Sequence, residues 1–154
     1  MSESDLSRSS LPSAEIGVAT PILRVNAIET SLAFYATGLG FELLWRDAGF
    51  ACVGRGEASL MLCEGGQGHP GGWAYIGASD VDVLAAEFRG RGVVLRHPPT
   101  NYPWGAREMQ VADPDGNVLR FGAGARPDEP PGDWLDADGR LWSPQPDGSW
   151  RAAP

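Results

Sequence analysis

The feature that most limits the fold of this chain is an internal repeat in its pattern of apolar runs and chain breakers. Gly40-Phe41, after the first predicted helix, corresponds to Gly92-Val93 after the second, a shift of 52 positions. Self-similarity at so long a period marks a repeated structural unit. We predict two βαβββ units, each a small curved sheet with a helix on one face. The other face stays apolar and concave until it is covered, so the units are expected to pair.

The predicted strands are short apolar or alternating runs bounded by turn residues. In the first unit they span residues 18–25, 41–46, 50–53 and 58–63. In the second unit they span residues 73–78, 93–96, 107–112 and 118–121. Together with one helix per unit, these runs predict an α+β fold with a curved mixed sheet and a cleft.

Each predicted helix combines an apolar stripe with a polar residue near its start. The first stripe consists of Ile28, Leu32, Tyr35 and Leu39, and the second of Val81, Leu84, Ala85 and Phe88. Asn26, followed by Glu29, has the spacing of a capping box. Ser79 or Asp80 is expected to cap the second helix.

The composition divides the chain into three parts. Residues 1–15 are Ser-rich and lack periodicity, which is typical of a flexible arm. Residues 16–122 form one predicted domain, and residues 123–154 form a C-terminal extension that begins with a Pro-rich link.

The extension holds tryptophans at a regular spacing of eight residues, at Trp134, Trp142 and Trp150. Asp138-Gly139 and Asp147-Gly148 place a turn between successive tryptophans. An isolated hairpin is marginal in water. We therefore predict a hairpin whose Trp134 and Trp142 pack on the sheet or on a partner subunit, near the cleft.

The chain is acidic, with a formal net charge of −8 at pH 7 and a sequence pI near 4.6. Nucleic acid and anionic membranes require a basic surface, so neither is expected as a partner. No apolar run reaches the roughly 18 residues of a membrane helix, which predicts a cytoplasmic protein. Cys52 and Cys63 lie in apolar runs and are expected to be reduced, buried thiols.

Several motifs resemble the vicinal-oxygen-chelate superfamily of glyoxalase I, extradiol dioxygenases, fosfomycin-resistance thiol transferases and bleomycin-resistance proteins. The strongest motif is a strand, turn and strand over residues 110–122, with Asp113-Pro114-Asp115-Gly116-Asn117 at the turn. Upstream motifs are Ile22-Leu23-Arg24-Val25, Ser31-Leu32-Ala33-Phe34-Tyr35 and Leu39-Gly40-Phe41. The resemblance covers roughly residues 17–122 and implies that the concave sheet faces form a ligand cleft.

Metal-dependent members of that superfamily hold a divalent ion with His, Gln or Glu at positions that correspond here to Thr20, Trp73 and Arg120. These residues are a weak hydroxyl ligand, an indole that only donates, and a permanent cation. His69 and His97 fall on none of these positions. The chain therefore most resembles the metal-free bleomycin-resistance branch, as does its segment from Tyr102 to Glu108. We predict no metal, no cofactor and no catalytic residue.

Strand alternation selects the residues expected to face the cleft. The predicted ligand-binding residues are Trp73, Tyr75, Tyr102, Trp104, Arg107, Arg120 and Arg24. The aromatic members could stack on a planar ligand, or could instead fill the core or a dimer interface. The arginines suit an anionic ligand and the net charge suits a cationic one, while Glu42 and Glu108 could neutralise the arginines, so the sign of the ligand's charge stays open.

We predict metal-independent binding and sequestration of a small, partly aromatic molecule, with a glycopeptide antibiotic as one candidate. The alternative is a metal-dependent lyase, dioxygenase or thiol transferase of the same superfamily. A third possibility is an interaction module whose tryptophans bind protein. The resemblance also implies a homodimer, since bleomycin-resistance relatives build their clefts between two chains.

Overall fold

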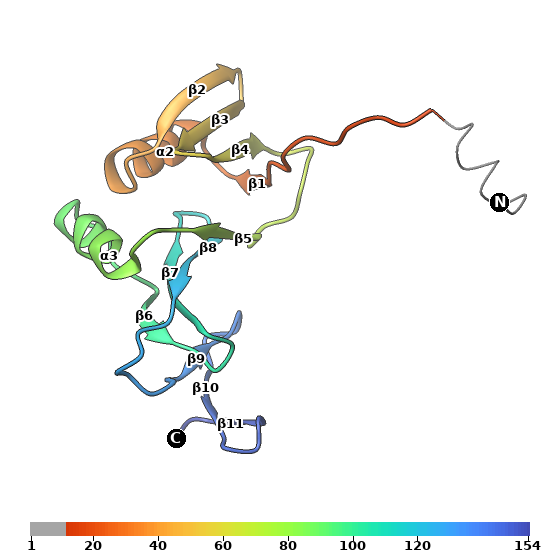
Figure 1. Cartoon of the computed structure of the whole chain (residues 1–154). Coiled ribbons are helices and arrows are strands. Elements are labelled where there is room, and N and C mark those ends of the chain that lie inside the picture. The colour runs from red at the N-terminus through yellow and green to blue at the C-terminus, as the bar shows by residue number, and fades with distance from the viewer. Residues whose placement is uncertain (1–11) are drawn as a thin grey trace, which may run out of the picture.

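The βαβββ pattern recurs in a computed structural model, which describes residues 12–154 (Figure 1). The first unit contains β1 (Ile22–Val25), α2 (Ile28–Ala33), the π-helical turn η1 (Phe34–Gly38), β2 (Glu42–Asp47), β3 (Phe50–Arg55) and β4 (Ala58–Glu64). The second contains β5 (Trp73–Gly77), α3 (Val81–Gly90), β6 (His97–Asn101), β7 (Ala106–Ala112) and β8 (Val118–Gly124). The extension adds β9 (Trp134–Leu135), β10 (Leu141–Pro144) and β11 (Trp150–Ala152).

The two units form equivalent sheets, with strand orders β1-β4-β3-β2 and β5-β8-β7-β6. In each sheet the first strand lies parallel to the last, and the other pairs are antiparallel. The extension forms a third sheet in the order β11-β10-β9. The predicted α+β fold with a C-terminal Trp-rich hairpin extension is therefore confirmed.

The core lies between the helices and the inner faces of the two large sheets. Apolar residues from both units form one buried cluster, which includes Tyr35, Leu39, Phe88, Leu62 and Leu119. Both predicted helical stripes face this cluster, although Leu32 and Leu84 are only partly buried. Cys52 and Cys63 are buried free thiols, as predicted.

The two helices begin differently. Asp80 caps α3 as expected, because its carboxylate accepts hydrogen bonds from the backbone N–H groups of Asp82 (3.0 Å) and Val83 (3.1 Å). The predicted capping box at Asn26 is wrong. Instead, the carboxylate of Glu64, at the end of β4, accepts a bond of 2.7 Å from the backbone N–H of Ile28. A long-range contact thus replaces the local cap.

Two predicted strands have different bounds in the structure. The strand predicted at residues 93–96 is wrong, and the chain pairs one segment later, as β6, despite Pro98 and Pro99. Proline is tolerated there because β6 is an edge strand and its register shifts between His97 and Thr100. The strand predicted at 18–25 begins only at Ile22, after Pro21.

The predicted flexible arm lies mostly outside the described residues, which begin at Pro12. Residues 12–20 have no regular secondary structure and extend away from the two large sheets (Figure 1). No helix within residues 12–154 has the length and apolar character needed to cross a membrane.

The turn between β7 and β8 joins the two units through the buried carboxylate of Asp113. One oxygen accepts bonds from the backbone N–H groups of Asp115 and Asn117, each 2.9 Å. The other accepts bonds from the Asn117 side chain (2.9 Å) and from the hydroxyl of Tyr35 in the first unit (3.0 Å). Burial and the Asp113 charge raise the pKa of Tyr35 far above its usual value, which keeps this hydroxyl protonated as a donor.

Asn117 completes this junction. Its side-chain amide donates to the carbonyl of Arg24 in β1 (2.8 Å) and accepts from the backbone N–H of Gly72, just before β5 (2.9 Å). A single side chain therefore connects the first strand of each unit to the turn that closes the second.

Arg107 anchors the extension to α3. Its guanidinium contacts Asp82 of α3 at 2.8 Å and Glu129 of the extension at 2.6 Å, and it also donates to the side chain of Asn101 at 3.2 Å. Arg107 is only 6% exposed. The paired guanidinium holds the pKa of the Asp82 carboxyl below its usual value.

We expect Tyr35→Phe to lower the free energy of unfolding by about 1–3 kcal/mol, because a buried hydrogen bond to a carboxylate is lost. Urea denaturation of the purified protein measures this change. Tyr75→Phe is the matched control, since Tyr75 is 55% exposed, and should change stability by less than about 0.5 kcal/mol. Equal stability of the Tyr35 variant and the wild type would contradict the junction role.

We expect Arg107→Met to lower the free energy of unfolding by about 2–3 kcal/mol, because two carboxylates lose a buried partner but can still reach water. Arg126→Met is the control: Arg126 contacts the same two carboxylates at 3.3 and 3.8 Å but is more exposed, so its loss should cost under about 1 kcal/mol. Unchanged stability of Arg107→Met, with weaker ligand binding, would instead support a ligand role.

Candidate ligand-binding site

Side chains of β5, β7 and β8 that point away from the core gather on the outer face of the second sheet. Alternation along β5 and β8 turns Ala74, Leu119 and Phe121 inward and leaves Trp73, Tyr75 and Arg120 on the outer face. Tyr75 pairs with Arg120, and Arg120 pairs with Gln110 of β7, so these side chains form one row across the sheet. Strand alternation therefore gives β5 and β8 one buried face and one outer face.

An ion pair occupies the centre of this face. The guanidinium of Arg120 donates to Glu108 of β7, through Nε at 2.9 Å and also through Nη2. The other oxygen of Glu108 accepts a bond of 2.6 Å from the indole N–H of Trp104. Glu108 is only 2% exposed, so water can do little to stabilise its charge. The paired guanidinium of Arg120 compensates that charge instead. The face consequently presents a paired charge rather than a free cation.

Aromatic rings surround this ion pair and form an aromatic group, which consists of Trp73, Tyr75, Tyr102, Trp104 and Trp134. Trp104 stacks on Tyr102, with ring centroids 4.7 Å apart and planes inclined by 17°. Trp134 of the extension lies against Trp73 (6.2 Å), Tyr102 (5.8 Å) and Trp104 (6.3 Å). The Arg120 guanidinium lies 4.8 Å from the centroid of Trp134 and 5.6 Å from that of Tyr75. Stacked rings and guanidinium–ring contacts of this kind are favourable at the faces of planar groups, so the same side chains are suited to binding a planar ligand.

Gly122 makes room for Tyr75 on this face. The Tyr75 ring crosses β8 at Gly122, and a Cβ at that position would overlap the ring and its hydroxyl. Only glycine therefore allows Tyr75 to lie across the neighbouring strand without displacing it.

The extension covers part of the face and leaves a cavity of about 420 Å³. Its walls are Trp104 and Arg120 of the second sheet and Trp134, Trp142 and Trp150 of the extension. Trp134 packs on the sheet, as its sequence predicts. The contribution of Trp150 was not anticipated, although its spacing of eight residues from Trp142 was a visible signal of it.

Two predicted site residues lie elsewhere. Arg24 donates to the carbonyls of Gln67 and Gly68 (2.8 and 3.0 Å) and so holds the linker between the units. Arg107 lies on the helix side of its strand, against Asp82, and does not join the aromatic group. Tyr102 is buried beneath Trp104, so its ring supports the site rather than facing solvent.

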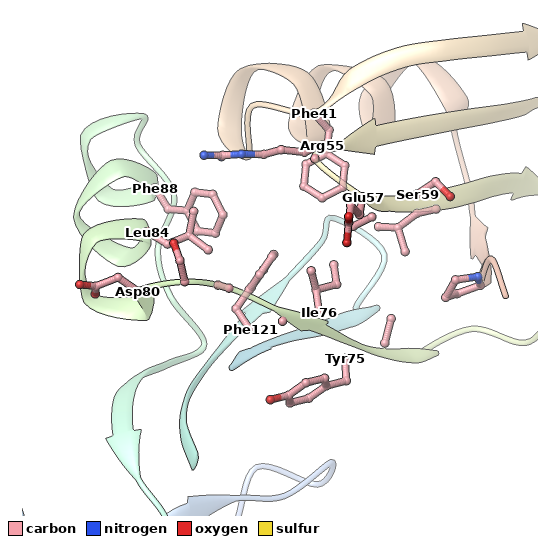
Figure 2. A pocket seen from close by; sticks show the side chains of 18 of the residues that line it. Phe41, Arg55, Glu57, Ser59, Tyr75, Ile76, Asp80, Leu84, Phe88 and Phe121 are labelled. Carbon is pink, nitrogen blue, oxygen red and sulfur yellow. The ribbon is translucent and has the colours of Figure 1, made fainter. Parts of the chain in front are cut away.

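A larger cleft, of about 890 Å³, opens between the two units (Figure 2). Phe41 and Arg55 come from the first unit, and Ile76, Phe88 and Phe121 from the second. Arg55 is paired with Glu87 at 2.6 Å. Of the seven predicted ligand-binding residues, Tyr75 alone lines this cleft.

Two titratable groups beside these rings, Tyr102 and His97, are neutral at pH 7. Burial, together with the charge of Glu108, raises the pKa of Tyr102 to about 12. Burial lowers the pKa of His97, whose ring nitrogen lies 3.4 Å from the Tyr102 hydroxyl. Aromatic rings with the compensated pair of Arg120 and Glu108 therefore line most of the site, a composition suited to binding a mostly apolar ligand.

The residues at the superfamily's metal positions do not form a donor set for a divalent ion. The hydroxyl of Thr20 lies 3.3 Å from that of Ser59, Trp73 offers only an indole, and Arg120 is a cation paired with Glu108. Within residues 12–154, no group of three or more His, Cys, Asp or Glu side chains is placed to hold a metal ion.

Residues 16–121 match the family model of the glyoxalase/bleomycin resistance protein/dioxygenase superfamily. A bleomycin resistance protein of Klebsiella pneumoniae is 31% identical, over 67% of this chain and 89% of that protein. One of Geobacillus stearothermophilus is 28% identical, over 66% of this chain and 92% of that protein.

A solved structure of a bleomycin-binding protein is also similar to this chain. The bleomycin-binding protein from bleomycin-producing Streptomyces verticillus, complexed with copper(II)-bleomycin, matches with a TM-score of 0.62 and 29% identity. The match covers 73% of this chain and 100% of that protein. The repeated βαβββ architecture, the sequence similarity and the family model agree, and the chain belongs to the glyoxalase/bleomycin resistance protein/dioxygenase superfamily.

Proposed function

We propose that this protein binds and sequesters a small, partly aromatic molecule without a metal ion, in the manner of a bleomycin-resistance protein. The aromatic group on the outer face of the second sheet carries the proposal. Trp104 lies on Tyr102 and is itself 51% exposed, so one face of a large flat ring remains available. Aromatic rings in such positions are frequent anchors of bound ligands.

Bleomycin, a glycopeptide antibiotic, is the first ligand to test, because the curated relatives are named for resistance to it and a structural neighbour was solved with it. The charges of Arg120 and Glu108 already compensate each other. The pair therefore favours a ligand whose binding does not depend on one strong charge. The residues at the superfamily's metal positions do not support the alternatives of a metal-dependent lyase, dioxygenase or thiol transferase.

We also propose that the protein is a homodimer. An apolar row crosses the first sheet on its outer face, in the register Ile22, Met61, Cys52 and Trp45. Its outer members, Ile22 and Trp45, are 39% and 43% exposed. Ile16 and Val18 on the extended segment are almost fully exposed as well. Apolar surface of this kind is normally covered by a second chain.

We expect Trp104→Ala to weaken bleomycin binding by about 1–3 kcal/mol, roughly five- to 150-fold in Kd, as for a stacked anchor. Isothermal titration calorimetry with metal-free bleomycin in the presence of EDTA measures the affinity and tests metal independence together. Trp104→Phe is the matched control, because it keeps a ring but removes the N–H donated to Glu108.

Affinity retained in Trp104→Phe and lost in Trp104→Ala would show that the ring face binds the ligand. If the wild-type protein does not bind metal-free bleomycin but binds its metal complex, metal independence is wrong. Normal binding by Trp104→Ala would remove Trp104 from the site.

For the dimer, we expect light scattering at micromolar concentration to give twice the chain mass of 16.4 kDa. A double variant, Ile22→Glu and Trp45→Glu, should shift the protein toward the monomer, because it places charge in the apolar row. A wild-type mass of one chain would refute the proposal.

A further inference from the structure

The C-terminal extension supplies most of the wall of the cavity of about 420 Å³ on the second sheet. The family model ends at residue 121, and β9, β10 and β11 all lie beyond it. Nevertheless three of the four indoles around the cavity, Trp134, Trp142 and Trp150, come from these strands. This part of the chain therefore builds onto the superfamily domain a wall that the domain alone does not have.

The extension is held in place by specific bonds to the second sheet. Gln110 donates to the carbonyl of Leu135 at 2.9 Å, and Arg96 donates to the carbonyl of Asp136 at 2.6 Å. Arg96 also bonds to the Gln110 side chain and lies over the Trp73 ring at 5.4 Å. The polar groups of Gln110 are thus satisfied by the sheet edge and the extension together.

Within the extension, polar side chains orient the indoles. Trp142 donates its indole N–H to Asp136 at 2.8 Å, and Asp136 also accepts from the backbone N–H groups of Asp138 and Arg140. Gly139 and Gly148 adopt φ of 83° and 87° at the two Asp-Gly turns, which reverse the chain between successive tryptophans. The ring of Trp150 consequently returns to lie 6.0 Å from that of Trp104.

We propose that the C-terminal sheet is a wall of the ligand site and that Trp142 and Trp150 bind a flat, uncharged aromatic ring system together with Trp104. This inference rests on the proposed function and assigns ligand-binding residues outside the superfamily domain. A compact fused-ring group enters the cavity, and the rest of a larger ligand extends from its open side.

The shape of the walls favours a flat group. The planes of Trp104 and Trp150 are inclined by 46°, and those of Trp104 and Trp134 by 75°, so ring faces and edges surround the space. A cavity of about 420 Å³ lies in the lower part of the range for small-molecule sites. Trp104 keeps half of its surface exposed although the extension is docked. The rings thus do more than fill the interface between extension and sheet.

The charges around the walls favour a neutral group. Arg120 lies in the wall and disfavours a cation, while the carboxylate of Asp136, which accepts the indole N–H of Trp142, disfavours an anion. Glu108 compensates Arg120 across the same face. A neutral ring therefore enters without separating an existing ion pair.

The test uses the full-length protein and two probes with the same carbon skeleton. 2-Naphthol is flat and aromatic, whereas decahydro-2-naphthol is its saturated, non-planar counterpart. Binding is measured by NMR through the indole N–H signals of the six tryptophans, which are assigned with single Trp→Phe variants. We expect 2-naphthol to shift the signals of Trp104, Trp142 and Trp150, and to bind at least tenfold more tightly than the saturated probe.

Trp142→Ala and Trp150→Ala should each weaken 2-naphthol binding roughly tenfold. The Trp→Phe variants at the same positions keep a flat ring and should retain most of the affinity, which separates loss of the ring from loss of the fold. Equal affinity for both probes, or unchanged affinity in both alanine variants, would overturn the inference.

The same variants separate this inference from the proposed function. If Trp104→Ala loses bleomycin binding while Trp142→Ala and Trp150→Ala retain it, the extension is not a wall of the site and the proposed function stands. If the protein does not bind bleomycin, yet 2-naphthol binding depends on Trp142 and Trp150, the cavity is a ligand site and the proposed ligand type is wrong.

Discussion

The buried carboxylate of Asp113 is the contact on which the arrangement of the two units depends. It accepts four hydrogen bonds, one of them from Tyr35 of the first unit, while Asn117 of the same turn reaches β1 and the segment before β5. A buried charge is tolerated only when such bonds compensate it, so the turn, α2 and the first strands must come together in one geometry. That geometry sets the angle between the two sheets and therefore the faces they present.

The outer faces of the two large sheets differ in what covers them. On the second sheet, the C-terminal sheet packs over Gln110 and Arg120 and leaves a cavity walled by indoles. On the first sheet, Ile22 and Trp45 remain exposed. One face is thus covered by its own chain, while the other carries the exposed apolar row on which the proposed dimer depends. The compensated pair of Arg120 and Glu108 makes the covered face suited to an uncharged, flat ligand.

Errors in the sequence predictions occur where a local pattern competes with a distant contact. Arg107 was expected in the cleft, but Asp82 and Glu129, which lie 25 residues before it and 22 after it, hold it on the helix side. Arg24 was expected there too, but the linker carbonyls bind it. The strand expected at residues 93–96 forms later, because the edge position tolerates Pro98 and Pro99. In each case the partner lies outside any window over which periodicity can be read.

The sequence by itself determined the repeated βαβββ architecture, the inward and outward faces of β5 and β8, and the residues at the metal positions. These depend on a period of two along strands, on turn residues and on side-chain chemistry, all of which are local. Only the tertiary structure decided that Glu108 neutralises Arg120, that Asp113 joins the units, and that Trp142 and Trp150 line a cavity with Trp104. These contacts join residues that lie far apart in the sequence, so they exist only once the separate elements have packed together in the buried core.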